Sequence, residues 1–351
     1  MSLFEHPEFD GHEHVSHFYD AATGLRAIVA IHSSRKSVAG GGIRFFPYAN
    51  SQDALCDVLR LSKGMTYKSA LAGLPFGGGK SVIIGDPRTQ KSEALLEAFG
   101  RCIERLGGKY ICAEDMGVTP DDMVAISRTT SLVTGLPGKS GDTSPLTGYG
   151  VYRALRAAAD RKLIRPLASA GILGFGNVGR NLAGHLRKDG VQLFVADINA
   201  ENVRLAVDKY GATEVGLDQF FSLKVDAIAP CSIGAVLNDE TVPLIQAFII
   251  CGGANNQLAD VEKHGRMLFE KGVLFVPDYI ANVGGLISGS AEVTGRSQTQ
   301  TQQMVENIYD TCMKIFQLAE ESSCSPLQAA EQLAVQILRK EASPYSGTSR
   351  S

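Results

Sequence analysis

The chain has 351 residues, of which 44% are hydrophobic and 20% charged, and its formal net charge is −3 at pH 7. This length predicts two domains, because one hydrophobic core rarely serves so many residues. The nearly neutral balance argues against nucleic acid or an anionic membrane as the partner, and no apolar run approaches the length of a transmembrane helix. The seven cysteines are scattered, and the N-terminus is polar and acidic. We therefore expect a cytoplasmic protein with reduced thiols and no signal peptide.

The first part of the chain predicts alternating strands and helices. A short branched segment at 25–32 is typical of a strand. Asn50 or Ser51 is expected to cap a helix, because apolar residues then recur at helical spacing until close to Lys68. Further strands are expected at 81–85 and 109–113. Further helices are expected at 91–106 and after Thr119, which is expected to cap the helix that begins with Pro120.

A change of composition at 134–150, with five glycines and two prolines, predicts an interdomain hinge. A helix is expected at about 148–160. Short apolar strands then alternate with helices, at 170–174, 192–196, 227–229, 248–251 and 273–276. This pattern predicts a parallel sheet covered on both faces. The stretch 282–295 is expected to be flexible, followed by helices at about 300–320 and 325–341 and a polar tail from Ser343.

The residues after the strand at 170–174 match the G-x-G-x-x-G pattern of dinucleotide-binding folds. The turn is expected to bind a cofactor through Gly174, Gly176, Asn177, Val178 and Gly179. Its glycines allow a pyrophosphate to approach the free N–H groups of the following helix. Asp197 ends the next strand, 18 residues beyond Gly179, where it can accept from the adenosine ribose. With that carboxylate and no arginine close by in sequence, the pattern favours NAD over NADP.

Two lysines, Lys68 and Lys80, bracket an uncharged stretch that contains Gly77–Gly79. Lysine is rarely buried without a partner, and burial or a neighbouring cation disfavours the ammonium, so such a lysine can act as a base near neutral pH. The glycines are expected to let a substrate approach the backbone beside Lys80. The alternative is a solvated lysine at the end of a helix and another in a turn.

A set of short motifs keeps its order between about residues 10 and 340. They are Gly41-Gly-Ile-Arg44-Phe, Lys63-Gly-Met-Thr-Tyr-Lys68, Gly77-Gly-Gly-Lys80, Ala113-Glu-Asp115-Met-Gly, Ala229-Pro-Cys-Ser-Ile-Gly234, Gly253-Ala-Asn-Asn256 and Pro277-Asp-Tyr-Ile-Ala-Asn282-Val-Gly-Gly285. Together they resemble the glutamate/leucine/phenylalanine/valine dehydrogenase family, most closely its leucine dehydrogenase branch.

The resemblance implies NAD-dependent oxidative deamination of an L-amino acid to a 2-oxo acid, and the reverse amination. It implies that Lys68 holds the substrate carboxylate. Lys80, its pKa lowered by burial and by Lys68, would activate the water that attacks the iminium carbon, and Asp115 would relay protons. The expected substrate-site residues are Lys68, Gly40, Gly41, Gly42, Met65, Ala113, Leu286 and Gly289. The expected cofactor-side residues beyond the glycine-rich turn are Asp197, Thr147, Cys231, Asn255, Asn256 and Asn282.

The resemblance also implies the organisation of the molecule. We expect an α/β fold of two domains with the active site in the cleft between them. An N-terminal substrate-binding and oligomerisation domain would cover 1–140, together with returning C-terminal helices at about 310–345. A Rossmann-type domain with a doubly wound parallel sheet would cover 141–309. Relatives imply a homo-oligomer without a metal.

The expected substrate side chain is apolar. Glutamate-specific members of the family carry a lysine where Gly40 stands, and without it a buried second carboxylate has no partner. Leucine-specific relatives tend to have a larger aliphatic residue there, and a branched residue where Gly289 stands, whereas Ala113 fits the leucine type. Leucine, valine and isoleucine are favoured overall. Two glycines that enlarge the pocket keep phenylalanine as an alternative.

Two other classes of function compete with this interpretation. A non-catalytic NAD-binding regulator would not need Lys68, Lys80 and Asp115 together. A 2-hydroxy-acid dehydrogenase would need a histidine–carboxylate pair and an arginine after Gly179. The run of His12, His14 and His17 is interpreted as a solvated or oligomer-contact segment rather than a metal site, and Cys231 and Cys251 as small buried hydrophobes.

Overall fold

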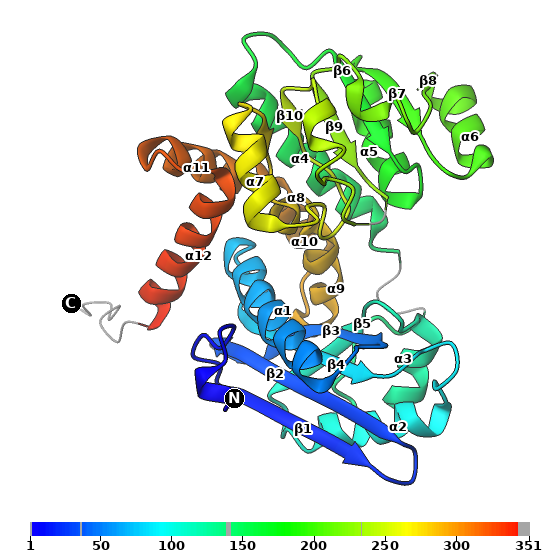
Figure 1. Cartoon of the computed structure of the whole chain (residues 1–351), viewed down its shortest axis with the longest axis vertical. Helices are drawn as coiled ribbons and strands as arrows, with labels where there is room; N and C mark the ends of the chain where they lie inside the picture. Colours follow the sequence, from blue (N-terminus) through cyan, green and yellow to red (C-terminus); the bar gives the residue numbers. More distant parts are fainter. Residues whose placement is uncertain (1, 36, 138–141, 233, 343–351) are drawn as a thin grey trace. The chain divides into compact units, whose positions relative to one another are not determined.

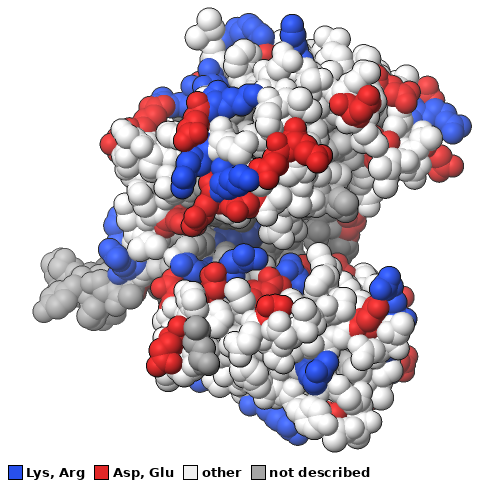
Figure 2. All heavy atoms as spheres, in the orientation of Figure 1, with Lys and Arg blue, Asp and Glu red and all other residues white. Residues whose placement is uncertain are grey.

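The computed structural model describes residues 2–35, 37–137, 142–232 and 234–342. Its contacts divide the chain into two compact α/β units (Figure 1). The first unit is Met1–Gly141 with Glu292–Gly295 and Ala334–Ser351, and the second is Asp142–Ala291 with Arg296–Leu333. On the face drawn in Figure 2, acidic and basic side chains are interspersed. No helix within the described ranges is long and apolar enough to cross a membrane.

A five-stranded sheet, in the order β1-β2-β4-β3-β5, organises the first unit. Its strands are β1 (His14–Asp20), β2 (Leu25–Arg35), β3 (Ala39–Phe46), β4 (Phe76–Ile84) and β5 (Tyr110–Glu114). β3 runs parallel to β4 and β5, whereas β2 is antiparallel to β1 and β4. The sequence did not predict β1, because this edge strand carries no buried residue and so has no clear hydrophobic pattern.

Helices cover both faces of this sheet. Even-numbered residues of β2, such as Ile28 and Ala30, pack with α1 (Ser51–Leu71), and odd-numbered residues, such as Val29 and Ile31, pack with α2 (Glu93–Glu104) and α3 (Pro120–Ser127). Both predicted N-caps are confirmed. The Asn50 side chain accepts from Gln52 and Asp53 at the start of α1, and the Thr119 side chain accepts from Asp122 at the start of α3.

The glycines before Lys80 lie within β4 and not in a turn, because the strand begins at Phe76. A Cβ at Gly78 would lie 2.0 Å from the backbone nitrogen of Thr66 in α1, and a Cβ at Gly77 would lie 1.8 Å from the carbonyl oxygen of Ser33 in β2. These glycines allow the helix and the neighbouring strand to approach the β4 backbone closely. The prediction that they leave room for a substrate is therefore wrong.

A six-stranded parallel sheet organises the second unit, in the order β11-β10-β9-β6-β7-β8. The strands are β6 (Ser169–Leu173), β7 (Gln192–Ala196), β8 (Thr213–Glu214), β9 (Ala227–Pro230), β10 (Ile249–Ile250) and β11 (Leu274–Phe275). The chain enters at the central strand β6, runs outward to β8 and returns beside β6 as β9. This is the doubly wound order of dinucleotide-binding folds, with its switch point between β6 and β9. The predicted α/β class is confirmed.

Most of the second unit's helices connect or cover these strands (Figure 1). The helices after the first unit are α4 (Ser144–Lys162), α5 (Asn177–Lys188), α6 (Ala200–Tyr210), α7 (Val261–Glu270), α8 (Asp278–Ala281), α9 (Gly284–Thr294), α10 (Gln298–Glu306), α11 (Ile308–Glu321) and α12 (Pro326–Ala342). α4 packs against α5 and α11. Its Ala157 and Ala158 are fully buried, so these neighbours can approach closely.

The C-terminal part of the chain differs from the prediction in two respects. The stretch 282–295, expected to be flexible, contains α9. A Cβ at Gly284 would lie 2.1 Å from the carbonyl oxygen of Leu146, so the start of α9 packs tightly on α4. Of the predicted returning helices, α11 belongs to the second unit, and α12 belongs to the first unit from Ala334 onward, where Arg35 Nε donates to Glu341 Oε2 at 2.8 Å. The predicted tail from Ser343 lies outside the described residues, as do residues 138–141 of the predicted hinge.

The N-terminal histidines separate into buried and exposed side chains. His14 and His17 are exposed on β1, whereas His12 is buried and its Nε2 lies 3.0 Å from the carbonyl oxygen of Leu59. The expectation of a solvated segment is therefore wrong for His12. Its ring packs edge-on against His32, with centroids 4.9 Å apart. Within the described ranges no group of three or more His, Cys, Asp or Glu side chains could hold a metal ion.

Burial of this histidine pair predicts acid sensitivity. Burial, followed by repulsion from His12, lowers the pKa of His32 to about 4, and burial also lowers the pKa of His12. The His32 ring therefore stays neutral in the folded chain down to about pH 4, while in the unfolded chain it takes up a proton below about pH 6.5. The unfolding free energy should therefore fall as the pH drops from about 6.5 to 4, by about 1–3 kcal/mol for His32.

We expect His32→Asn, which cannot titrate, to flatten this decline in urea unfolding measured between pH 7 and pH 4. His17→Asn is the control, since His17 is exposed on β1 and its replacement should leave the pH dependence unchanged. An equally steep decline in wild type and His32→Asn would contradict the assignment.

Candidate active site and cofactor site

A largely buried ion pair of the first unit joins Lys80 of β4 to Asp115, directly after β5. Lys80 Nζ lies 2.9 Å from Asp115 Oδ2, and the two side chains are 7% and 27% exposed. Arg44 of β3 donates through Nε to the same oxygen at 3.3 Å. Parallel pairing of β3 with β4 and β5 places the three residues together. One carboxylate oxygen thus accepts from two cations.

Burial and neighbouring charges shift the pKa values of Lys80 and Asp115. Burial is the largest influence on Lys80 and lowers the pKa of its ammonium, against the attraction of Asp115. The charge of Arg44 lowers this pKa further, and the expected contribution of Lys68 stays a prediction. Burial alone would raise the pKa of Asp115, but Lys80 and Arg44 outweigh it and hold that pKa below its usual value.

The predicted substrate residues of the first unit lie mostly on one face of the sheet. Gly42 pairs with Ala113, and a Cβ at Gly42 would lie 2.7 Å from Asp115 Cβ and 3.1 Å from Lys80 Nζ. Gly42 therefore keeps a small apolar floor beside the ion pair. Gly41 differs, since its Cβ would point at the carbonyl oxygen of Gly79, 1.8 Å away, so its prediction as a substrate contact is not supported by its orientation.

The ring of Phe76 borders the space over Gly40. A Cβ at Gly40 would meet the ring of Phe76 at 3.4 and 3.5 Å, and Phe76 is buried. The phenylalanine ring is in ordinary van der Waals contact with that position, so the expectation that Gly40 enlarges the pocket stays a prediction. Met65 and Lys68 are half-buried in the second half of α1.

The remaining predicted substrate residues lie in the second unit. Leu286 and Gly289 are half-buried on α9. A Cβ at Gly289 would have no protein atom within 4 Å, so a side chain there could be larger without a clash.

The glycine-rich turn of the second unit has the geometry that a dinucleotide requires. Gly174 has a φ of +90°, and a Cβ there would lie 2.8 Å from the backbone nitrogen of Ser232. A Cβ at Gly179 would lie 2.3 Å from the carbonyl oxygen of Gly174, so this glycine lets α5 pack on the turn. At Gly176, the N-cap of α5, a Cβ would meet nothing within 4 Å. A pyrophosphate could approach in that open space.

Asp197 follows β7 and is held beside the turn. Its Oδ2 accepts from the backbone N–H of Phe175 at 2.6 Å and from Asn202 Nδ2 at 3.0 Å. Burial acts against ionisation, but these hydrogen bonds and the charge of Arg180 lower the pKa of Asp197. The sequence showed no arginine close to Asp197, and the fold supplies one. Arg180 Nε donates to the carbonyl oxygen of Phe175 at 2.9 Å.

The other predicted cofactor residues come together at the carboxyl ends of β9 and β10. A Cβ at Gly253 would lie 2.5 Å from Val178 Cγ1 and 3.6 Å from Cys231 Sγ. Asn282 Nδ2 donates to Asn255 Oδ1 at 2.6 Å. Thr147 of α4 lies beside the start of α9, with Oγ1 2.8 Å from where a Cβ at Gly285 would be. Asn177, Asn255 and Asn256 are exposed, and burial raises the pKa of the Cys231 thiol to about 11.

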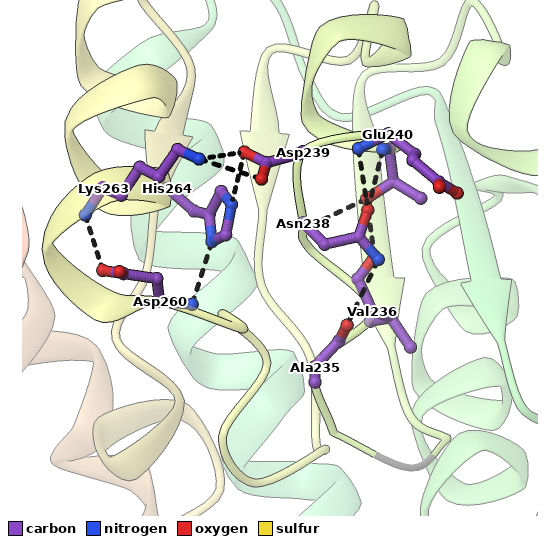
Figure 3. Close-up of polar contacts among 9 residues, drawn as sticks. Ala235, Val236, Asn238, Asp239, Glu240, Asp260, Lys263 and His264 are labelled. Atoms are coloured by element: carbon purple, nitrogen blue, oxygen red, sulfur yellow. Dashed lines mark hydrogen bonds and ion pairs between the residues drawn. The ribbon is translucent and has the colours of Figure 1, made fainter.

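A histidine clamp joins the two loops of this edge, 234–241 and 252–260 (Figure 3). Asn256 O accepts from the backbone of Ala235 at 2.7 Å, which ties the loops near the predicted cofactor residues. Farther along, His264 Nδ1 accepts from the Asp260 backbone at 2.9 Å, so Nε2 carries the hydrogen that reaches Asp239 Oδ1 at 3.2 Å. Lys263 Nζ also binds Asp239, at 2.8 Å.

His264 is 3% exposed, and its loss would remove two hydrogen bonds, one from the backbone N–H of Asp260 and one to Asp239. We expect His264→Phe to lower the unfolding free energy by about 1–3 kcal/mol and to raise the KM for NAD by loosening the loop of Asn255 and Asn256. The control is His185→Phe, which keeps an aromatic ring beside Tyr149 and Tyr152 and should change neither quantity greatly. An unchanged KM in a destabilised His264→Phe would show that the clamp only supports the fold.

A doubly wound sheet with a dinucleotide-type turn, and a buried lysine–aspartate pair on a second sheet, define the class of a nucleotide-dependent dehydrogenase. Comparison with known families gives the same class. Residues 12–132 match the model "Glu/Leu/Phe/Val dehydrogenase, dimerisation domain", and residues 193–344 match "Glutamate/Leucine/Phenylalanine/Valine dehydrogenase". The chain belongs to this family of amino-acid dehydrogenases, which generally use NAD or NADP. The predicted family and enzyme class are confirmed.

Individual relatives differ in the amino acid in their names. A leucine dehydrogenase from Thermoactinomyces intermedius is 42% identical over 98% of this chain and 96% of its own. A valine dehydrogenase from Streptomyces albus is 42% identical over 94% of this chain and 93% of its own. An L-tryptophan dehydrogenase from Nostoc punctiforme is 42% identical over 95% of both chains. The crystal structure of that enzyme covers 95% of this chain and 97% of its own, with a TM-score of 0.85.

Proposed function

We propose that this chain catalyses the NAD-dependent oxidative deamination of leucine, valine or isoleucine to the 2-oxo acid and ammonia, and the reverse amination. The observation that carries the proposal is the buried Lys80–Asp115 pair beside the glycine and alanine floor of β3 and β5. The leucine and valine dehydrogenases among the relatives support the choice of substrate. We also propose that the protein is cytoplasmic and that it forms a homo-oligomer.

In this proposal each site residue has a separate role. Lys68 binds the substrate carboxylate. Lys80, whose ammonium is disfavoured by burial, takes the proton of the water that attacks the iminium carbon, and Asp115 moves protons to and from the amine. Bound NAD supplies the hydride acceptor. The glycine-rich turn and Asp197 would bind NAD. The residues that would orient it are Thr147, Cys231, Asn255, Asn256 and Asn282.

An aromatic L-amino acid is the second candidate substrate. The tryptophan dehydrogenase is as similar as the others, and the surroundings of Gly289 are open. Against it stands the buried ring of Phe76, which borders the space over Gly40. We therefore favour the branched aliphatic substrates.

The test is NADH formation from NAD at alkaline pH with leucine, valine, isoleucine, phenylalanine, tryptophan and a set of 2-hydroxy acids. We expect the highest kcat/KM for a branched aliphatic amino acid, a lower kcat/KM with NADP, and no reaction of hydroxy acids. A higher kcat/KM for tryptophan or phenylalanine would favour the second candidate. Turnover of hydroxy acids alone would overturn the proposal.

A further inference from the structure

A chain of alternating charges extends beyond the Lys80–Asp115 pair. Arg44, which donates to Asp115 through Nε, also donates through Nη1 to Asp57 of α1 at 2.8 Å. Tyr48 donates its hydroxyl to the same oxygen of Asp57 at 2.6 Å. The side chains of Arg44 and Asp57 are 13% and 14% exposed. Five side chains from β3, α1, β4 and the residues after β3 and β5 thus form one network.

The order of charges matters when Lys80 loses its proton. Asp115 would then be a largely buried carboxylate without its lysine partner, and burial favours protonation of such a group. Arg44 remains on the same oxygen, and as a guanidinium it stays charged at every relevant pH. Asp57 and Tyr48 fix the far side of that guanidinium. The network therefore keeps a cation beside Asp115 in both protonation states of Lys80.

We propose that Arg44 is a positioning residue of the reaction, which holds Asp115 in place and ionised while Lys80 alternates between ammonium and amine. This inference rests on the proposed role of Lys80 as the base. Arg44 touches neither substrate nor cofactor in this role and acts through Asp115. Asp57 orients Arg44 and partly offsets its charge.

Charged groups on several elements determine the direction of each effect. Arg44 of β3 lowers the pKa of Lys80, whereas Asp115 beyond β5 and Asp57 of α1 raise it. Tyr48 is bound to Asp57, and His32 of β2 is engaged by Thr66 of α1. Glu114 of β5 is exposed, and Tyr110 of β5 points into the other layer of the unit. Lys68 is half-buried and is the basic residue in the last turn of α1.

The experiment is the pH dependence of kcat/KM for leucine, whose acid limb reports the group that must lose a proton in the free enzyme. Arg44→Met removes the cation and keeps an unbranched side chain. Its acid limb should move to higher pH by about one unit, so that activity falls by up to about tenfold on the acid side of the limb and recovers in alkali. Asp57→Asn should move the limb in the opposite direction, to lower pH. Arg44→Lys, which keeps the charge, should restore the limb partly or fully.

Arg60→Met is the matched control. Arg60 also lies near Asp57, at 3.8 Å, but its side chain is 66% exposed, so the acid limb should stay where it is. A loss of activity in Arg44→Met that is equal at every pH, or limbs of Arg44→Met and Asp57→Asn that move together, would overturn the inference. A wild-type chain that oxidises no amino acid would instead overturn the proposed function.

Discussion

Lys80→Ala should lower kcat for leucine about 10³-fold, within the range that removal of a general base produces. The reason is geometric and electrostatic. Lys80 is 7% exposed, its pKa is lowered by burial, and its Nζ donates to Asp115 Oδ2 at 2.9 Å. NAD binding should persist in this variant, because the predicted cofactor residues lie in the second unit. Steady-state kinetics and NAD titration by calorimetry measure the two effects separately.

Two further variants separate lost chemistry from a damaged fold. Lys80→Met keeps the length of the side chain and should be as inactive as Lys80→Ala, with Asp115 still paired to Arg44. Lys91→Met removes another lysine from an ion pair of the same unit, Lys91 Nζ to Asp122 at 2.6 Å, and should remain active. Full activity of Lys80→Met would refute the role of Lys80 as the base, whatever its stability.

The sequence predicted the parts of the fold whose signal is local. The strand, glycine-rich turn and helix around Gly174, and the caps at Asn50 and Thr119, need only neighbouring residues to form, and all appear in the structure. Elements that depend on distant partners were missed or wrong. β1 is an edge strand with no buried residue. α9 starts with glycines because α4 packs closely against them, and this contact with α4 is not visible in the local sequence.

The same distinction applies to the candidate site. Lys80 and Asp115 were selected because each stands in a recognisable motif, but their contact joins positions 35 apart in sequence. Arg44 lay inside a predicted motif without a role, and its two carboxylate partners belong to different elements. The sequence shows that Gly77–Gly79 have no side chains. It does not show whether a substrate or the protein's own backbone occupies the space beside them. That question was decided by α1 and β2.

Gly174→Ala should raise the Kd for NAD at least 100-fold and destabilise the second unit. Its φ of +90° is unfavourable for alanine, and the new Cβ would lie 2.8 Å from Ser232 N and 2.9 Å from the carbonyl carbon and oxygen of Cys231. These are backbone atoms, so the loop after β9 would have to move, and with it the predicted cofactor residue Cys231. Calorimetric NAD titration and thermal unfolding measure both consequences.

Substitutions at two other glycines test whether backbone strain, a steric clash or a lost ligand contact causes the weaker NAD binding of Gly174→Ala. Gly190→Ala introduces a positive-φ alanine, at +76°, with no atom within 4 Å of its Cβ, so it should cost about 1–2 kcal/mol of stability and leave NAD binding intact. Gly176→Ala has the opposite character, with a φ of −71° and open space around the Cβ. It should keep the stability of wild type and still weaken NAD binding, because the methyl group would enter the space proposed for the pyrophosphate. If Gly176→Ala bound NAD as tightly as wild type, the cofactor would have to lie elsewhere on the second unit, and the loss in Gly174→Ala would reflect a distorted fold alone.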